Sequence, residues 1–254
     1  MTSTRMRNDE LLALARDLAG RLLGKHGEAG VLAVGVHGPA AHGEDATGLD
    51  LAVVTTGPEV EVPERLLRHR GVVVDLGVIA AEDYLAEAAL VGPAWPLVVD
   101  QYRSMAPVYD PSGFFGKLRA AHDEAMASAP EGAFLAAAGW DLAQALGQQA
   151  RAAAAEAAGD AAAALFAVRE GALLAALTLG LIGRSAYRDQ RHALAVASAA
   201  PMPPGFAETF RLAVDPESDA HLAVAALGEA LAALTDLARR DGLPFEAADL
   251  DDFL

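Results

Sequence analysis

The chain has 254 residues and a formal net charge of −16, with 53% hydrophobic and 21% charged residues. This composition is typical of a folded protein and excludes a disordered chain. The negative charge disfavours DNA or RNA as a partner, because it repels a phosphate backbone, and it would attract a small cationic molecule. Acidic residues that only keep an apolar chain soluble explain the charge equally well. Cysteine is absent, which excludes disulfides, thiolate metal sites and cysteine nucleophiles.

The N-terminal residues 1–8 are polar and lead into a charged amphipathic segment, so we expect no signal peptide. The longest uncharged apolar run, residues 171–183, is shorter than the roughly 20 residues that a membrane span needs. This run predicts a buried helix. We expect a cytoplasmic protein with no membrane partner.

Short apolar runs separated by turn residues dominate the first 113 residues. A first helix is predicted from Asn8 or Asp9 to Gly24 or Gly27, because its leucines recur at helical spacing. Strands are predicted at 31–36, 49–55, 71–79 and 104–109, and a helix at 81–91.

From Phe114 onward the strand signals stop, and long helical segments separated by Gly and Pro take over. Helices are predicted at about 114–128, 131–158, 160–182, 186–199, 205–213 and 217–241. The pattern predicts an α+β fold. Residues 1–113 form a domain with a β-sheet and flanking helices, and residues 114–254 form an all-helical domain.

Polar residues stand at the end of the first predicted strand and inside the next two. The first strand runs into Gly35-Val36-His37-Gly38-Pro39, and Asp50-Leu51-Ala52-Val53 follows after a loop. Alternate residues of a strand face the same side, so carboxylates at such positions can converge on one metal ion. Asp75 lies among valines in the third strand, where an aspartate is unexpected unless something pairs with it.

A second group of residues carries a more specific signal. Trp95-Pro96-Leu97 is followed by Gln101, then by Ala106-Pro107-Val108-Tyr109-Asp110 and Gly113. In order and spacing this resembles the aminoglycoside (kanamycin) 4'-nucleotidyltransferases of the nucleotidyltransferase superfamily. The resemblance implies a nucleotidyltransferase-type mixed β-sheet, a C-terminal helical bundle and a homodimer whose active sites lie between subunits. It also implies Mg-ATP as donor, an aminoglycoside hydroxyl as acceptor, and Asp50 and Asp75 as metal-binding carboxylates.

The chain departs from that family at five positions. Pro39 stands where the family has a serine, which removes a hydroxyl and a backbone N–H. Ala52 replaces the second carboxylate, and His42 replaces an arginine that meets the phosphates. Gln144 falls on the family's general base and Gln148 on its phosphate-contacting lysine. Phosphoryl-type transfer depends on such groups, so we predict that nucleotidyl transfer is lost.

The residues that remain allow two interpretations. Asp50 and Asp75 are weak candidates for one divalent ion, or are a hydrogen-bonded pair left from ancestry. His37 and His42 are candidates for an acid or a base, or are surface residues of a polar loop. We take Asp50, Asp75 and His42 as the candidate catalytic residues and place His37 among the ligand-binding residues.

A polar stripe recurs at three- and four-residue intervals on the predicted helix 131–158. The resemblance directs this stripe into a cleft, whereas the alternative is an ordinary solvent-facing side. Together with residues near the loop that follows the first predicted strand, the stripe would form a neutral, hydrogen-bonding pocket. The stripe consists of Asp141, Gln144, Gln148 and Arg151, and the other predicted ligand-binding residues are His37, Gly38, Asp100 and Gln101.

Three functional hypotheses follow. The first is a homologue without nucleotidyl transfer, repurposed to bind or transform a small polar or cationic molecule. The second is an active nucleotidyltransferase that uses Mg and ATP, with His42 as a substitute base. The third is a biosynthetic enzyme of unrelated chemistry on the same fold. Mg and ATP are expected as cofactors only under the second.

Overall fold

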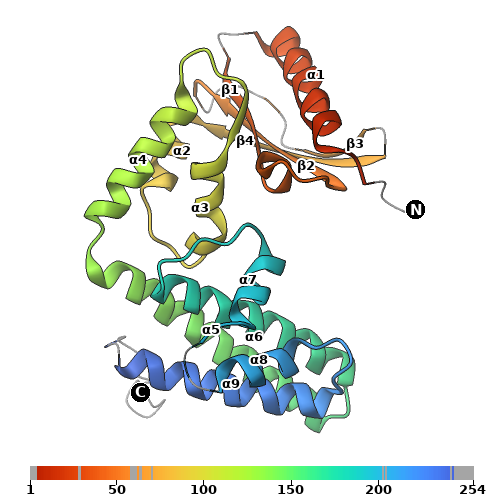
Figure 1. Ribbon diagram of the computed structural model, residues 1–254, viewed down its shortest axis with the longest axis vertical. Coiled ribbons are helices and arrows are strands. Elements are labelled where there is room, and N and C mark those ends of the chain that lie inside the picture. The colour runs from red at the N-terminus through yellow and green to blue at the C-terminus, as the bar shows by residue number, and fades with distance from the viewer. Residues whose placement is uncertain are drawn as a thin grey trace. The chain divides into compact units, whose positions relative to one another are not determined.

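The computed structural model describes residues 5–27, 30–57, 62, 65–69, 71–201, 203, 205–240 and 242 (Figure 1). The chain divides into two compact units, each described here by itself. The first comprises Met1–Leu90 and Val98–Ala129, and the second comprises Val91–Leu97 and Pro130–Leu254. The observed class is α+β, as predicted, with a sheet in the first unit and helices in the second.

Within the described residues, the first unit contains a five-stranded sheet in the order β3-β4-β2-β1-β5. Strands β2 and β4 are parallel and the other neighbours are antiparallel, so the sheet is mixed. The central strands are covered on both faces, which explains their nearly continuous apolar sequences. The strands are β1 (Val31–His37), β2 (Gly48–Thr55), β3 (Arg65–His69), β4 (Val72–Ala80) and β5 (Ala106–Tyr109).

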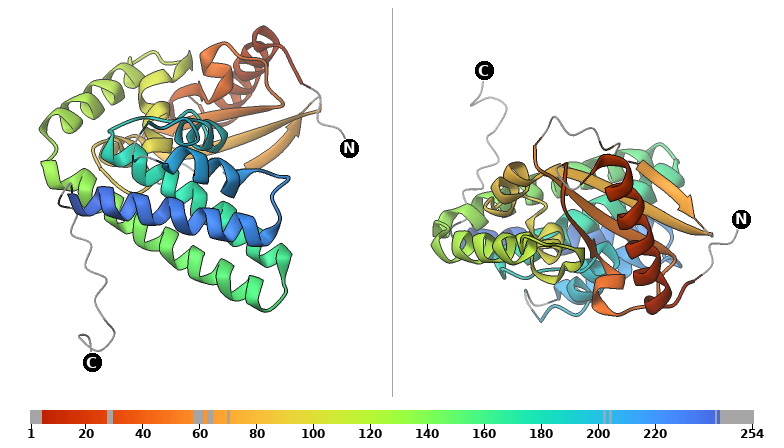
Figure 2. Two further views of the ribbon diagram at one scale, coloured as in Figure 1. Left: turned by 60° about the horizontal axis from the view of Figure 1, so that its bottom comes forward. Right: turned by 90° about the horizontal axis from the view of Figure 1, so that it is seen from above.

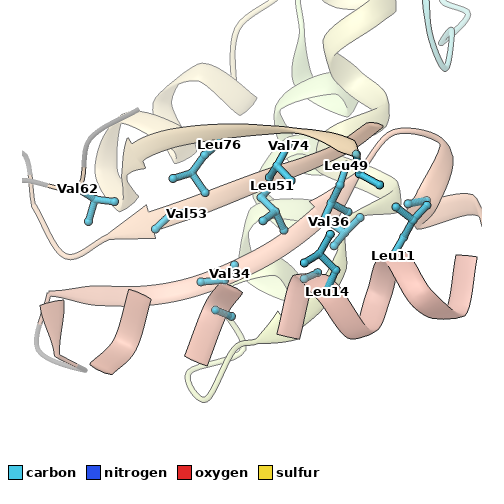
Figure 3. Packing of buried hydrophobic residues seen from close by; sticks show 14 of the residues in the cluster. Leu11, Leu14, Val34, Val36, Leu49, Leu51, Val53, Val62, Val74 and Leu76 are labelled. Carbon is cyan, nitrogen blue, oxygen red and sulfur yellow. The ribbon is translucent and has the colours of Figure 1, made fainter. Parts of the chain in front are cut away.

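Two apolar clusters cover the two faces of this sheet. Helix α1 (Asn8–His26) packs on one face through Leu11, Leu14 and Ala15, against valines and leucines of β1, β2 and β4 (Figure 3). Helices α2 (Ala81–Ala88) and α4 (Phe114–Ser128) pack on the other face. A short 3-10 helix, η1 (Pro39–His42), follows β1.

Helix α4, which the sequence pattern assigns to the helical domain, belongs instead to the first unit. Its residues Phe114, Phe115 and Leu118 are buried together with Tyr84 and Tyr102. The strand signals do stop at Phe114, but the apolar face of α4 is needed to close the sheet. The first unit therefore extends to Ala129 rather than to residue 113.

Besides the short helix η1, a strand and a helix were not predicted. Strand β3 has the sequence Arg-Leu-Leu-Arg-His, which lacks apolar alternation, and it forms because it pairs along β4 as an edge strand. Helix α3 (Trp95–Ser104) carries the motif that supported the family resemblance. Its last residue, Ser104, donates its hydroxyl to the Asp100 carbonyl oxygen at 2.7 Å, so the predicted strand at 104–109 begins at Ala106 instead.

The second unit is a helical bundle built on the antiparallel pair α5 and α6, with α9 packed on both (Figure 2). Asp160 caps α6 by accepting a hydrogen bond from the Ala163 N–H, which fixes the turn between α5 and α6. The helices are α5 (Glu131–Ala157), α6 (Ala161–Ile182), α7 (Gln190–Ala197), α8 (Phe206–Val214) and α9 (Ala220–Arg240).

Small residues let these helices approach closely. A Cβ at Gly171 of α6 would lie 2.9 Å from the Leu227 side chain of α9. Alanines 223, 226 and 230 of α9 are buried inside the unit. Among the described residues, α6 and α9 are long and apolar enough to cross a membrane by length and composition. At least half of each apolar window is buried within the protein, so these two helices are weak evidence for a membrane span.

Candidate functional site

His37, Asp50 and Asp75 lie side by side across three neighbouring strands of the first unit. His37 of β1 is in register with Asp50 of β2, and Asp50 is in register with Asp75 of β4. Residues that pair directly across strands face the same side of a sheet. We call these three residues the polar row. The sequence predicted the two aspartates as a pair but did not predict His37 beside them.

The polar row continues the sheet face that α2 and α4 cover. Ala52 and Val54 follow Asp50 at two-residue steps and are buried in the apolar cluster with Phe115. The row therefore lies where the apolar cluster ends and polar side chains begin. His37 and Asp50 are half-buried, and Asp75 is exposed.

Gly38 makes room for the Asp50 carboxylate. It has φ +69°, a conformation that favours glycine, and a Cβ at this position would lie 2.7 Å from Asp50 Oδ2. The carboxylate thus packs directly over the Gly38 backbone. A glycine is therefore required at position 38 for a steric reason, although Pro39 follows it in place of the expected serine.

A second pair of polar side chains joins η1 to α3. His42 Nε2 lies 2.9 Å and 3.2 Å from the two carboxylate oxygens of Asp100. These side chains are 27% and 15% exposed, so solvent screens the pair only partly. A carboxylate that holds one ring nitrogen of a histidine fixes the orientation of the ring. The sequence named both residues but did not pair them.

Burial controls the charges of the polar row. Burial lowers the pKa of His37 below its ordinary value, and the nearby carboxylates Asp50, Asp75 and Asp100 offset part of this effect. Burial also raises the pKa of Asp50; His37 opposes this change and Asp75 adds to it. Burial thus disfavours the charged form of both side chains, and carboxyl groups are the prevailing ionisable groups around His37.

The residues present do not fit the Mg-ATP of the resembled family. Mg²⁺ requires several oxygen ligands in octahedral geometry, and the row supplies carboxylates only from Asp50 and Asp75. Ala52 stands where the resembled family has its second carboxylate, and this alanine is 6% exposed within the apolar cluster. Across the described part of the chain, no group of three or more His, Asp or Glu side chains is placed to hold a metal ion.

Two residues that sequence reasoning missed close the apolar end of the site. A Cβ at Gly35 would lie 2.6 Å from Met105 Sδ and 2.8 Å from the Phe115 ring. Met105 and Phe115 thus occupy the space above Gly35. Gly35 lies two residues before His37 on β1 and faces the same side of the sheet. No polar signal marks such residues in a sequence, because their role depends on packing alone.

Gln101 is half-buried on α3, directly after Asp100, and its side chain interacts with Tyr102. Consecutive residues of a helix point about 100° apart around the axis. Gln101 is therefore directed toward the neighbouring tyrosine and not to the side of Asp100. Of the predicted residues, His37 and Gly38 lie next to Asp50, Asp100 lies near His37, and His42 contacts Asp100.

The polar stripe predicted on α5 belongs to the second unit and is not uniform. Asp141 is 2% exposed, Gln144 is exposed, and Gln148 donates a hydrogen bond to Glu170 of α6 at 2.9 Å. The Asp141 Oδ2 atom is buried without a hydrogen-bond partner in the described structure. Burial raises the pKa of Asp141 to about 7. That the stripe and the polar row share one ligand stays a prediction.

A scan against protein-family models and a search of curated proteins both find no match for this chain. Among solved structures, the chain is similar to a nucleotidyltransferase-like protein from Exiguobacterium sibiricum. The two share 13% sequence identity with a TM-score of 0.48, over 89% of this chain and 75% of that chain.

Proposed function

We propose that this chain is a diverged nucleotidyltransferase homologue without nucleotidyl transfer, and that its polar row binds a small polar molecule through a cationic amine. The observation that carries the proposal is the alignment of Asp50 and Asp75 on neighbouring strands beside His37. The sequence resemblance supports the ancestry, and the departures at Pro39, Ala52, Gln144 and Gln148 support the loss of activity.

Charge favours a cationic ligand at this site. Among the ion pairs of the described residues, neither Asp50 nor Asp75 has a lysine or arginine partner. An ammonium group supplies the missing positive charge and donates up to three hydrogen bonds to carboxylate oxygens. Hydrogen bonds to charged groups contribute about 1.5–3 kcal/mol each. A triphosphate, in contrast, would be repelled by the carboxylates of Asp50 and Asp75.

Neighbouring groups suit the rest of a polar ligand. The His42–Asp100 pair presents an oriented imidazole beside the carboxylates, which can exchange a hydrogen bond with a ligand hydroxyl. Leu66 is in register with Asp75 on the edge strand β3 and is 72% exposed, so it offers an apolar contact at the end of the row. A polyhydroxylated amine matches this combination of acidic, polar and apolar groups.

Calorimetric titration with kanamycin, using sucrose as an uncharged control, tests this proposal. We expect saturable binding of the amine only, and a dissociation constant about 10-fold higher in Asp50→Asn, which corresponds to about 1.4 kcal/mol. Asp83→Asn is a matched control, because Asp83 is an exposed aspartate of the same unit on α2. An equal loss of affinity in both variants would mean that only the net charge of the protein matters, and it would contradict a specific site at the polar row.

A second candidate function is an active Mg-ATP-dependent nucleotidyltransferase. The adjacency of Asp50 and Asp75 and the orientation of His42 by Asp100 favour it. The poor fit to a metal ion and the absence of a second carboxylate at Ala52 oppose it. Titration of Mg²⁺ and ATP into the protein separates the two candidates, since only the second requires tight, mutually dependent binding of both.

We also propose that the chain forms the homodimer that the resemblance implies, through α5. Trp140 is 62% exposed on α5, with the exposed small residues Ala136, Ala143 and Gly147 at three- and four-residue steps around it. An exposed tryptophan within a small-residue face suits close packing of two helices. Two copies of charge −16 repel each other, but salt screens this repulsion beyond about 8 Å.

Sedimentation equilibrium at micromolar concentration is expected to give twice the chain mass of 26.1 kDa. Trp140→Glu should shift the population toward monomer, whereas Leu212→Glu, at an exposed position of α8, should not. A monomer mass for the unmodified protein at all concentrations would rule out the dimer.

A further inference from the structure

A small apolar hollow lies on the sheet face opposite to the polar row. It has a volume of about 140 Å³ and opens between the C-terminal half of α1 and the strands β3 and β4. Its lining residues are Leu18, Leu22, Leu67, Val74 and Leu76, with Arg21 and Lys25 at its rim. All of them belong to the first unit.

The hollow exists because α1 packs fully against the sheet only in its N-terminal half. Near the start of the helix, Leu11 and Leu14 are buried against β1 and β2, whereas Leu18 and Leu22 near its end are only half-buried. Figure 3 shows Leu76 toward the end of the cluster away from Leu11. On the edge strand, Leu67 is 37% exposed. Aliphatic surface is thus left uncovered beside an edge strand, where an apolar ligand gains by burying it.

The rim of the hollow is cationic in a strongly acidic protein. Arg21 and Lys25 stand four residues apart on the same side of α1. Arg21 pairs with Asp17 at 2.9 Å, so its charge is partly neutralised. Lys25 has no ion-pair partner among the residues that the structure describes, and its ammonium group is exposed at the rim.

From this volume, lining and charge, we propose that the hollow binds a small carboxylate with an apolar body of about six carbons. Cavities of about 150 Å³ lined by aliphatic side chains hold a benzene-sized ligand, which sets the size of the body. The carboxylate group stays at the opening and pairs with Lys25. This site is separate from the polar row and takes a ligand of opposite charge, so it does not depend on the proposed function.

The experiment is a titration of the full chain with heptanoate, followed by NMR of labelled leucine and valine methyl groups. Heptylamine is the matched probe, because it has the same alkyl chain and the opposite charge. We expect saturable shifts at Leu18, Leu22, Leu67 and Val74 with heptanoate, and at least 5-fold weaker binding of heptylamine. A comparison of the two probes distinguishes a charge-selective site from unspecific burial of an alkyl chain.

Two variants complete the test. Lys25→Glu should weaken heptanoate binding at least 5-fold and strengthen heptylamine binding, whereas Lys117→Glu on α4 should change neither. Leu67→Trp, on the edge strand, should fill the hollow and abolish binding of both probes. The proposal is overturned if heptanoate causes no saturable shift at these methyl groups, if both probes bind equally, or if Leu67→Trp leaves heptanoate binding unchanged.

Discussion

Incubated with Mg-ATP and kanamycin, the purified protein is expected to form nucleotidylated product at least about 10⁴-fold more slowly than an active transferase. Loss of a general base alone lowers a rate by about 10²–10⁴-fold. Here Pro39 lacks the N–H and hydroxyl that would hold a phosphate oxygen, and Gln148 is hydrogen-bonded to Glu170. Mass spectrometry of the antibiotic after long incubation measures the product. Robust adenylylation would contradict the loss of activity.

The single change Ala52→Glu tests whether this one departure accounts for the predicted loss of activity. It restores the expected carboxylate, yet position 52 is 6% exposed within the apolar cluster that includes Ala33, Val54 and Phe115. An uncompensated buried carboxylate is costly, so we expect lower stability and no gain in transfer. Full activity from this change alone would show that the other departures are unimportant.

The sequence predicted those parts of the fold that local patterns encode. The continuous valine-rich runs of β1, β2 and β4 and the long alanine-rich helices were found, because the buried residues of these elements leave a clear hydrophobic signal. Strand β3 was missed because its edge position allows exposed leucines and charged residues in one short strand. Helix α4 was found but assigned to the other half, since periodicity does not say which partner a helix covers.

The candidate site shows the same division between local and distant information. The sequence named Asp50 and Asp75 as candidates, but only the strand register shows that His37 lies beside them. The His42–Asp100 contact joins residues 58 positions apart, and no local pattern predicts such a pair. Asp141 was assigned to a polar stripe by its spacing, whereas packing between helices buries it.

The charge of Asp141 is expected to cost the folded protein stability at high pH. Burial raises its pKa in the folded state from an ordinary value of 3.8 to about 7. Between these two values the unfolded chain releases a proton that the folded chain retains, so the stability of the fold decreases as pH rises through this window. The full difference corresponds to about 4 kcal/mol above pH 7.

Asp141→Asn removes this dependence because the amide does not ionise. Urea unfolding at pH 4 and pH 8 should show that the variant gains about 4 kcal/mol relative to the unmodified protein as the pH is raised. Asp83→Asn, which replaces an exposed aspartate of the first unit, is the matched control. A pH-independent effect of Asp141→Asn would mean that the folded protein accommodates the charge. Such a result would point to a cationic partner for Asp141, whereas the expected one marks it as a neutral core residue near pH 6.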